Sequence, residues 1–584
     1  MPSNTNYRFI KTSILGALAT VSFTTQALEF RIGDVDASFN SQLSIGSSWR
    51  VEEPSQSLLV AGNNNDGNEN YAKGDAFSQV FKGNHELHLR GETHGLLVRG
   101  KYWYDFALEE NSVPHGHSAN GFAENEKLND SGFNEFSKFS GAQLMDAYLY
   151  GLYYAGDSTI DVRLGRQVIS WGESTFILGG INAINPVDVN AFRRPGAEIK
   201  EGLLPVNLAY ANLGISADLS LEAFYQLEFQ ETVIPGCGTY FAFNDYAPQG
   251  CNQVLLTQGF PATADDKFIS ENGGVINRDV DGNRLAKDEN QYGFAMRYFS
   301  ELMGGTEFGL FYMNVHSRLP LINGVKSSNW QATTGADAAS LNAAIQNNKP
   351  DTFYYVTYPE DIQLTGLSFA TNVGSVALSG EVSHRHNTPL QINATQLLSA
   401  GLTGASSSPE LAADVAATGN GEDFQGYRLF DVSQAQVTMM QFFDRILGAS
   451  MYTLVAEAGY THVHDLDESD SAIKFGRSGI FDGQEEGFVT ESSWGYRLRF
   501  SGTYRNVIGG ASFTPMLAWS HDVEGFAPQP GGAFTEGNQS LGLSLDVNFA
   551  RYYTFGLAYT QYMEGDYNLS QDRDFASASF TAQF

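Results

Sequence analysis

The last ten residues, FASASFTAQF (575–584), alternate strictly between apolar and polar side chains. Successive side chains of a β-strand point to opposite sides, so one face of this segment would carry Ala576, Ala578, Phe580, Ala582 and Phe584. The other face would carry Ser577, Ser579, Thr581 and Gln583. The sequence therefore predicts an amphipathic strand that runs to the last residue.

The same period of two residues recurs through the chain. Clear examples are LVRGKYWYDF (97–106), LSLEAFYQLEF (219–229) and QSLGLSLDVNF (539–549). Segments of about ten residues, apolar on one face and polar on the other, match strands that cross an outer membrane with lipid outside and a polar lumen inside. A β-sandwich also alternates, but its strands are usually shorter and its outer face carries more charge.

Both ends of the chain fit a bacterial outer-membrane barrel. Such barrels end in an aromatic residue that the barrel-assembly machinery recognises, and we assign this role to Phe580 and Phe584. The segment NYRFIKTSILGALATVSFTTQA (6–27) has Arg8 and Lys11, then a short apolar run and a small-residue end. This pattern predicts a signal peptide over residues 1–27 and an exported barrel over 28–584, localised to the outer membrane. The alternative is an apolar N-terminal helix, and the run is too short to span a membrane.

Short and long connections alternate along the sequence. Eight short turns are expected at residues 91–95, 154–158, 215–218, 300–306, 372–375, 446–450, 505–510 and 550–554. Nine long polar loops are expected at about 53–81, 108–141, 171–205, 231–288, 319–360, 387–434, 464–492, 522–537 and 564–573. We therefore predict an all-β, antiparallel transmembrane barrel of about 18 strands (range ~16–18), with turns in the periplasm and loops outside.

Composition and motifs argue against several other functions. The formal net charge of −32 opposes nucleic-acid binding, which needs clustered Lys and Arg. The sequence has no Gly-x-Ser-x-Gly elbow, P-loop or His-Glu-x-x-His, so we expect no enzyme and no catalytic residue. Two alternative functions for an outer-membrane barrel are those of an enzyme and of an adhesin.

No metal site and no cofactor are predicted. His85 and His88 would point to opposite faces of a strand, and His115 and His117 are interpreted as plain loop residues, although the latter two could meet a metal. NNNDGNEN (63–70) and DVDGN (279–283) are ambiguous, because Gly282 does not match the EF-hand spacing. The acidic side chains of the outer loops are expected to be solvated by water. The alternative is that they bind a divalent cation near lipopolysaccharide.

The two cysteines fall in the fourth long loop. Cys237 and Cys251 enclose 13 residues, and the periplasm favours their oxidation. We predict a disulfide that orders the loop; two free thiols are the alternative.

The third long loop contains INAINPVDVNAFRRPGAEIKEG (181–202), where two prolines prevent regular strand pairing. Irregular backbone at membrane depth is tolerated where it lines a water-filled lumen. We predict that this loop folds inward as a constriction that sets selectivity, with Arg193 and Arg194 pairing with lumen carboxylates such as Glu222. The constriction would comprise Arg193, Arg194, Glu198, Lys200, Glu201, Arg163, Arg166, Glu173, Glu222 and Arg99. An exposed, solvated loop is the alternative.

Three segments, 81–106, 163–206 and 219–241, resemble a proteobacterial outer-membrane family catalogued as domain of unknown function 1302 (DUF1302), over about residues 28–584. A weaker resemblance, in GRQVISWGE (165–173), is to alginate exporters. The DUF1302 resemblance implies a porin-like barrel without known catalytic residues. It also implies gene neighbours that encode a periplasmic lipoprotein-carrier-like protein and a resistance-nodulation-division (RND) inner-membrane exporter, and hence sterol, hydrocarbon or lipid-like cargo.

These observations together predict an outer-membrane channel for small hydrophobic or amphipathic molecules, with uptake favoured. The alternative in the same membrane is an export route that works with the RND pump and the periplasmic carrier. Outer-membrane lipid, lipopolysaccharide and the barrel-assembly machinery are the expected partners, and nucleic acid is not.

Overall fold

The computed structural model describes residues 28–60, 62–261, 263–563 and 565–584. The predicted signal peptide, residues 1–27, lies outside the described residues. Within the described ranges, no helix is both long enough and apolar enough to cross a membrane.

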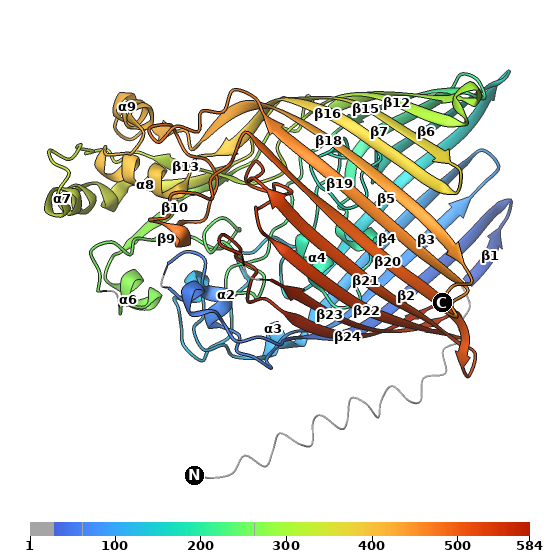
Figure 1. Cartoon of the computed structure of the whole chain (residues 1–584), viewed down its shortest axis with the longest axis horizontal. Coiled ribbons are helices and arrows are strands. Elements are labelled where there is room, and N and C mark those ends of the chain that lie inside the picture. The colour runs from blue at the N-terminus through green and yellow to red at the C-terminus, as the bar shows by residue number, and fades with distance from the viewer. Residues whose placement is uncertain (1–27, 61, 262, 564) are drawn as a thin grey trace, which may run out of the picture.

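Eighteen antiparallel strands close into a barrel (Figure 1). The ring closes where β2 pairs with both β3 and the C-terminal strand β24, and we call the β2–β24 junction the seam. A nineteenth strand, β1 (Leu28–Ile32), forms a hairpin with the start of β2 and is not part of the ring. The ring strands are β2 (Val35–Arg50), β3 (Ala76–Arg90), β4 (His94–Asp105), β5 (Ser140–Ala155), β6 (Ser158–Gln167), β7 (Val206–Gly214), β8 (Leu219–Gln226), β11 (Tyr292–Ser300), β12 (Thr306–Val315), β15 (Ile362–Val373), β16 (Val376–Gln391), β18 (Tyr427–Asp444), β19 (Met451–Val463), β20 (Ser492–Ile508), β21 (Ala511–Glu524), β22 (Gln539–Phe549), β23 (Tyr553–Tyr562) and β24 (Phe575–Gln583).

The two faces of the wall follow the predicted alternation. On the inner side of the seam, the hydroxyls of Ser44 and Thr581 lie 2.9 Å apart and are buried. On the outer side, large apolar side chains are exposed in cross-strand pairs such as Leu149 with Leu164 and Leu367 with Val382. An exposed apolar belt around a closed barrel is the surface that a lipid bilayer covers. The prediction of an outer-membrane β-barrel is confirmed.

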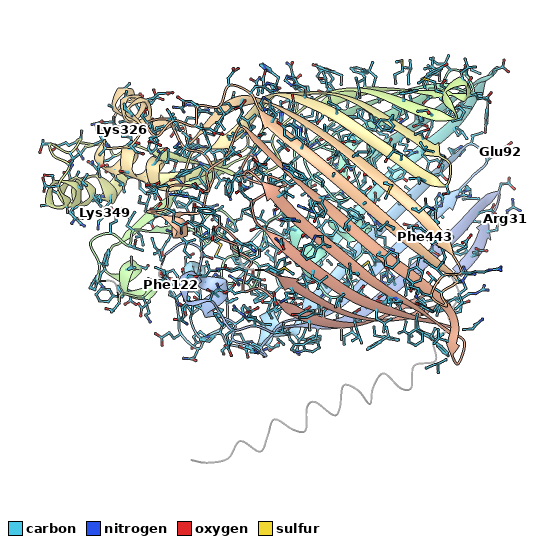
Figure 2. All side chains as sticks on the ribbon, in the orientation of Figure 1. Arg31, Glu92, Phe122, Lys326, Lys349 and Phe443 are labelled. Carbon is cyan, nitrogen blue, oxygen red and sulfur yellow. A yellow bond between two sulfur atoms is a disulfide. The ribbon has the colours of Figure 1, made fainter. Side chains whose placement is uncertain are left out.

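All eight predicted turns and all nine predicted long loops are present, and they lie at opposite ends of the barrel. The turn between β15 and β16 is Gly374-Ser375, where Gly374 has a φ of +64° that a residue without Cβ adopts without strain. In Figure 2, Glu92 and Phe443 mark the turn end, whereas Phe122 and Lys326 mark the loop end. The C-terminus lies at the turn end, as the strand count requires.

The long loops are more ordered than their composition indicated, because they fold into an outer cap. Three of them supply a five-stranded sheet in the order β17-β13-β14-β10-β9. Its strands are β9 (Gln253–Leu255), β10 (Val275–Arg284), β13 (Leu321–Val325), β14 (Phe353–Thr357) and β17 (Asp423–Phe424). The α-helices are α2 (Asp66–Glu69), α3 (Phe106–Glu110), α4 (Val189–Arg193), α5 (Ile199–Gly202), α6 (Asp266–Glu271), α7 (Ala338–Asn348), α8 (Ala394–Thr403) and α9 (Pro409–Ala417). Short 3₁₀ turns are η1 (Gln56–Leu58), η2 (Ser118–Asn120), η3 (Glu301–Met303), η4 (Lys349–Asp351) and η5 (Gly479–Phe481).

The predicted disulfide is confirmed. Cys237 and Cys251 are bonded within the loop between β8 and β9, with their Cα atoms 6.1 Å apart. Both residues are fully buried in an aromatic cluster of the cap that includes Phe133 and Tyr240. The bond therefore fixes the part of the fourth loop that lies beside the first and second loops.

Candidate functional site

The third outer loop, residues 168–205 between β6 and β7, lies inside the barrel. Its tip contacts the inner face of the seam. A Cβ added to Gly46 of β2 would lie 2.8 Å from the Cβ of Pro195, and one added to Gly196 would lie 3.1 Å from Ser579 of β24. Only a residue without a side chain leaves room for Pro195 at position 46, so the wall is shaped to receive the loop.

Buried ion pairs hold this side of the loop to strands β3 and β4. Lys82 Nζ lies 2.8 Å from the Glu201 carboxylate, and Lys101 Nζ lies 3.0 Å from that of Asp188. Asp188 also caps α4, accepting a hydrogen bond from the Ala191 N–H. Breaking a buried pair by removing one partner costs about 3–5 kcal/mol, because the remaining charge stays buried. These pairs therefore anchor the loop more firmly than surface charges would.

Other predicted constriction residues also contribute to the contact between the third loop and strands β2 to β4. Glu198 accepts a hydrogen bond from Gln42 Nε2 on β2 at 2.5 Å and lies 3.0 Å from Lys200 Nζ. Arg99 of β4 donates to the Lys200 carbonyl at 3.0 Å and is paired with Asp146 of β5. The structure thus brings together Arg99, Glu198, Lys200 and Glu201 at one wall, as the sequence predicted.

Arg193 and Arg194 also lie inside, but their predicted pairing with Glu222 is wrong. Arg193 stacks on the Phe241 ring at 4.3 Å and donates to the Tyr562 hydroxyl at 3.0 Å. Arg194 stacks on the Trp103 ring at 4.5 Å and donates to a backbone carbonyl. Among the described residues, neither guanidinium forms an ion pair with a carboxylate. Both guanidinium groups are therefore held by aromatic faces and by uncharged hydrogen-bond acceptors.

The opposite wall holds the loop through two carboxylates that the sequence analysis missed. Glu457 of β19 accepts hydrogen bonds from the backbone N–H groups of Thr175, Phe176 and Ile177 at 2.6–2.8 Å. Glu381 of β16 accepts them from Glu173 and Ile181 at 2.5 and 2.8 Å. Strand parity could have indicated them, because each glutamate lies between two small or apolar residues of the outer face, in GEVSH (380–384) and AEAGY (456–460), and therefore points into the lumen.

Glu222 belongs to a third cluster, on β8. Its carboxylate accepts from the Trp171 indole N–H at 2.7 Å and from the Tyr210 hydroxyl at 3.0 Å, and lies 2.8 Å from Arg297 of β11. Arg297 also faces Glu173 at 3.8 Å. Arg297 therefore neutralises the carboxylate that we had expected Arg193 or Arg194 to meet.

Two predicted residues stand apart from the constriction. Arg163 pairs with Asp161 on its own strand at 2.7 Å. Arg166 extends from the end of β6 to Gln230 and Glu228, beyond β8. Arg163 also stacks on the Tyr210 ring at 5.2 Å, beside Glu222. A role for the two arginines in the constriction stays a prediction.

An apolar core lies within the lumen. Ile169, Trp171, Ile181 and Ile184 of the loop are buried against inward-facing side chains of β7, β8, β11, β12 and β15, namely Leu208, Phe224, Ala295, Phe311, Met313 and Leu364. This differs from the uniformly polar lumen that the alternation predicted. Since the loop is bonded to β2–β4 on one side and to β16 and β19 on the other, it crosses the channel as a packed, fixed element.

The outer cap contains a cavity of about 450 Å³ above the barrel. Most of the side chains around it are apolar, and they come from the first, fourth, fifth, sixth and seventh outer loops, as do Val60, Val254, Leu341, Leu397 and Ile480. Polar groups at its edge include Asn63, Thr395 and Asp482. A volume of this size suits a small organic molecule.

A family model described as "Protein of unknown function (DUF1302)" matches residues 8–584. No curated protein matches the chain. Solved structures with a similar fold include Acinetobacter baumannii OccAB1, with 10% identity and a TM-score of 0.39 over 97% of this chain and 99% of that one. OccAB3 of the same organism has 8% identity and a TM-score of 0.40 over 95% and 100% of the two chains. Pseudomonas aeruginosa OccK2 (OpdF), solved in complex with glucuronate, has 10% identity and a TM-score of 0.37 over 94% and 97%.

Proposed function

The chain belongs to this DUF1302 family, and from that premise we propose that it is an outer-membrane channel for small hydrophobic or amphipathic molecules, working in the direction of uptake. The proposal assigns no catalytic step to the protein. It gives the outer cap the role of first binding site and the inward third loop the role of selectivity element.

The apolar cavity of about 450 Å³ carries the proposal. A channel for ions or sugars needs polar walls at its entrance, whereas Leu341, Leu397 and Phe424 would disfavour such solutes. Burial of apolar surface contributes about 25 cal/mol per Å² removed from water, so a sterol- or alkane-like molecule gains affinity there that a sugar does not. The polar groups at the edge suit one hydroxyl or carboxylate, which favours amphipathic acids and alcohols.

The charge inside the barrel supports the amphipathic part of the proposal. Arg193 and Arg194 hold their charges on aromatic rings, close to the wall that carries Lys82 and Lys101. In a confined lumen such charges raise the local concentration of anions. The carboxylate of a fatty or aromatic acid would be attracted there.

The test combines uptake with a matched pair of variants. A strain that lacks the gene is complemented with the parent chain, with Leu398→Trp or with Ala413→Trp. Each strain is then grown on sterols, alkanes, fatty acids and aromatic acids. Leu398 lines the cavity, so the tryptophan should fill it and reduce growth on the substrate concerned; Ala413 is exposed on α9 and its variant should behave as the parent. Undiminished growth of the deletion strain on every apolar substrate would refute uptake.

The same strain separates import from export. If the protein instead completes an export route with an RND pump and a periplasmic carrier, the deletion should leave lipid-like cargo accumulated inside the cell. In that case, growth on external substrates would be unchanged.

A further inference from the structure

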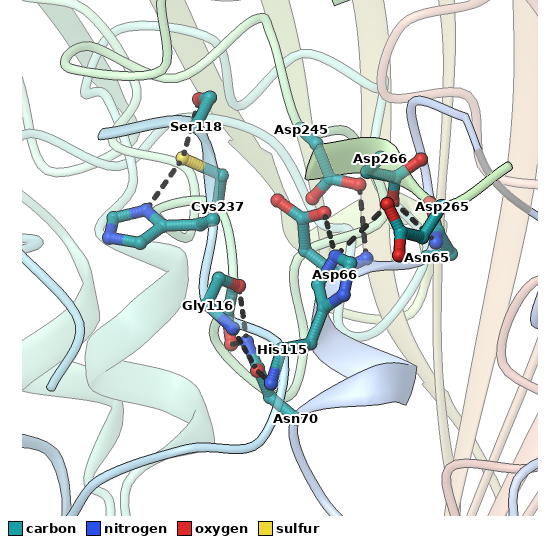
Figure 3. A network of polar contacts seen from close by, with 12 residues as sticks. Asn65, Asp66, Asn70, His115, Gly116, Ser118, Cys237, Asp245, Asp265 and Asp266 are labelled. Carbon is teal, nitrogen blue, oxygen red and sulfur yellow. Dashed lines mark hydrogen bonds and ion pairs between the residues drawn. The ribbon is translucent and has the colours of Figure 1, made fainter. Parts of the chain in front are cut away.

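Three side chains from three different outer loops meet within the cap (Figure 3). Asp66 comes from α2 in the first loop, His115 from the second and Asp266 from the start of α6 in the fourth. His115 Nε2 lies 3.4 Å from Asp66 Oδ1 and 3.2 Å from Asp266 Oδ2. We propose that Asp66, His115 and Asp266 bind one divalent transition-metal ion, which ties the three loops together.

The first argument is that both carboxylates are buried, and that the Asp66 oxygens and His115 Nε2 lack hydrogen-bond partners. Asp66 and Asp266 are each 1% exposed. Neither carboxylate oxygen of Asp66 accepts a hydrogen bond from a described residue, and His115 Nε2 makes no hydrogen bond of acceptable geometry to either acid. A buried carboxylate without partners destabilises the fold, so native proteins pair such groups or use them to bind a cation.

The second argument is the local excess of negative charge. Asp245, also buried, lies beside the trio with Oδ2 3.3 Å from the Asp66 N–H, and half-buried Glu69 is close by. Arg573 is near but is engaged by Asp572 and by the Tyr240 carbonyl. A bound dication would offset this charge directly.

The donor set indicates the class of ion. One imidazole nitrogen with carboxylate oxygens suits Zn²⁺, Mn²⁺ or Co²⁺, whereas Ca²⁺ and Mg²⁺ prefer oxygen ligands alone. Bonds of about 2.0–2.1 Å at a tetrahedral angle place two ligands about 3.3 Å apart. The two separations from His115 Nε2 already have this value, and all three ligand atoms lie within 4.8 Å of one another.

Neighbouring groups hold the ligands in place. Asp266 accepts hydrogen bonds from Asn65 Nδ2 and the Gly62 N–H, both at 2.8 Å, and the Asn70 side chain accepts from the backbone N–H of His115 at 3.2 Å. His117 is not a ligand, because its two ring nitrogens contact Cys237 Sγ and the Asn129 N–H. In this proposal His115 is a metal ligand and not the plain loop residue that the sequence analysis expected. Two residues further on, His117 contacts the sulfur of Cys237, which belongs to the disulfide.

The test measures metal content and affinity of the full barrel in detergent. After chelator treatment and dialysis, the parent chain should bind one Zn²⁺ per chain in calorimetry and one Co²⁺ with the d–d absorption of a low-coordinate site. His115→Gln and Asp66→Asn should each weaken Zn²⁺ binding at least tenfold, because each variant removes one ligand of the ion. Heat-modifiable migration on gels reports that each variant still forms the barrel.

Asp265→Asn is the matched control. Asp265 is adjacent to the site but accepts from the Phe268 N–H as the cap of α6, which asparagine also does, so metal binding should not change. Parent protein that binds no Zn²⁺, Mn²⁺ or Co²⁺ stoichiometrically would overturn the proposal. So would equal binding by folded His115→Gln, or Ca²⁺ binding tighter than Zn²⁺.

Discussion

The Glu457 carboxylate of β19 accepts a hydrogen bond from the backbone N–H of Ile177 at 2.8 Å, across 280 residues of sequence. Two neighbouring N–H groups, of Thr175 and Phe176, point to the same carboxylate. One wall residue thereby satisfies three consecutive donors of an irregular segment, which would otherwise need water in the lumen. The inward loop is thus held through its backbone and not only through its side chains.

Glu457→Gln should loosen the inward loop. Hydrogen bonds to a charged acceptor contribute about 1.5–3 kcal/mol each, and glutamine keeps only one oxygen acceptor and adds two donors that face the same N–H groups. We expect larger and noisier single-channel conductance in planar bilayers and a lower unfolding temperature. Glu86→Gln, a change on the lumen face of β3 away from residues 175–177, is the control. Parent-like traces from Glu457→Gln would show that the contact does not restrain the loop.

Arg193→Ala combined with Arg194→Ala should shift ion preference toward cations, because the loop loses two positive charges that no described carboxylate neutralises. Reversal potentials in a salt gradient measure the shift. The double lysine variant keeps the charge but not the planar stacking on Trp103 and Phe241, so it should retain most of the anion preference.

Deleting residues 186–200 should widen the pore and raise conductance, since this segment holds the contacts to Lys101 and Gln42. A parent chain with no conductance at all would contradict the ion-selectivity role. A closed barrel that passes apolar cargo by a partner-gated or lateral route would then be the better account.

Phe584→Asp should impair barrel assembly. Phe584 exchanges backbone hydrogen bonds with Ser41 of β2, of 2.6 and 2.8 Å, at the turn end of the seam. A charge on this apolar face would oppose both recognition and membrane insertion. The yield of the heat-modifiable form measures assembly. Gln583→Asp places the same charge on the neighbouring residue of the other face and should assemble nearly normally; equal yields from both would refute the assembly-signal role.

Removing the disulfide should loosen the fourth loop without opening the barrel. A closed loop of this length gains about 3 kcal/mol in the chain-entropy model. The Cys237→Ser and Cys251→Ser double variant should therefore be cut faster by protease within residues 227–291 while keeping its heat-modifiable migration. Reductant should accelerate cleavage of the parent to the same rate and leave the variant unchanged.

Much of the barrel could be predicted because strand parity and turn composition are local properties. The alternation around Lys101 correctly placed it in the lumen, and Gly374 marks a two-residue turn that the sequence shows directly. The helices of the cap were missed because the polar composition of the loops concealed them. Asp337 followed by an alanine-rich stretch was an available helix-start signal for α7.

The partners inside the barrel could not be predicted, because they depend on which wall each part of the loop reaches. The alternation and the loop lengths in the sequence do not show that Arg297, rather than Arg193, lies next to Glu222. The same is true of the cap, where Asp66, His115 and Asp266 come from loops separated by up to 200 residues. Sequence reasoning found the disulfide because both cysteines lie in one loop.

Contact between Pro195 and Gly46 has a consequence for the order of assembly. The seam joins the first strand of the ring to the last, so it forms only after residue 584 has been synthesised and delivered. The loop tip touches both sides of this junction from within. The contacts between the loop tip and the seam are therefore complete only once the ring has closed, and they brace the junction against reopening.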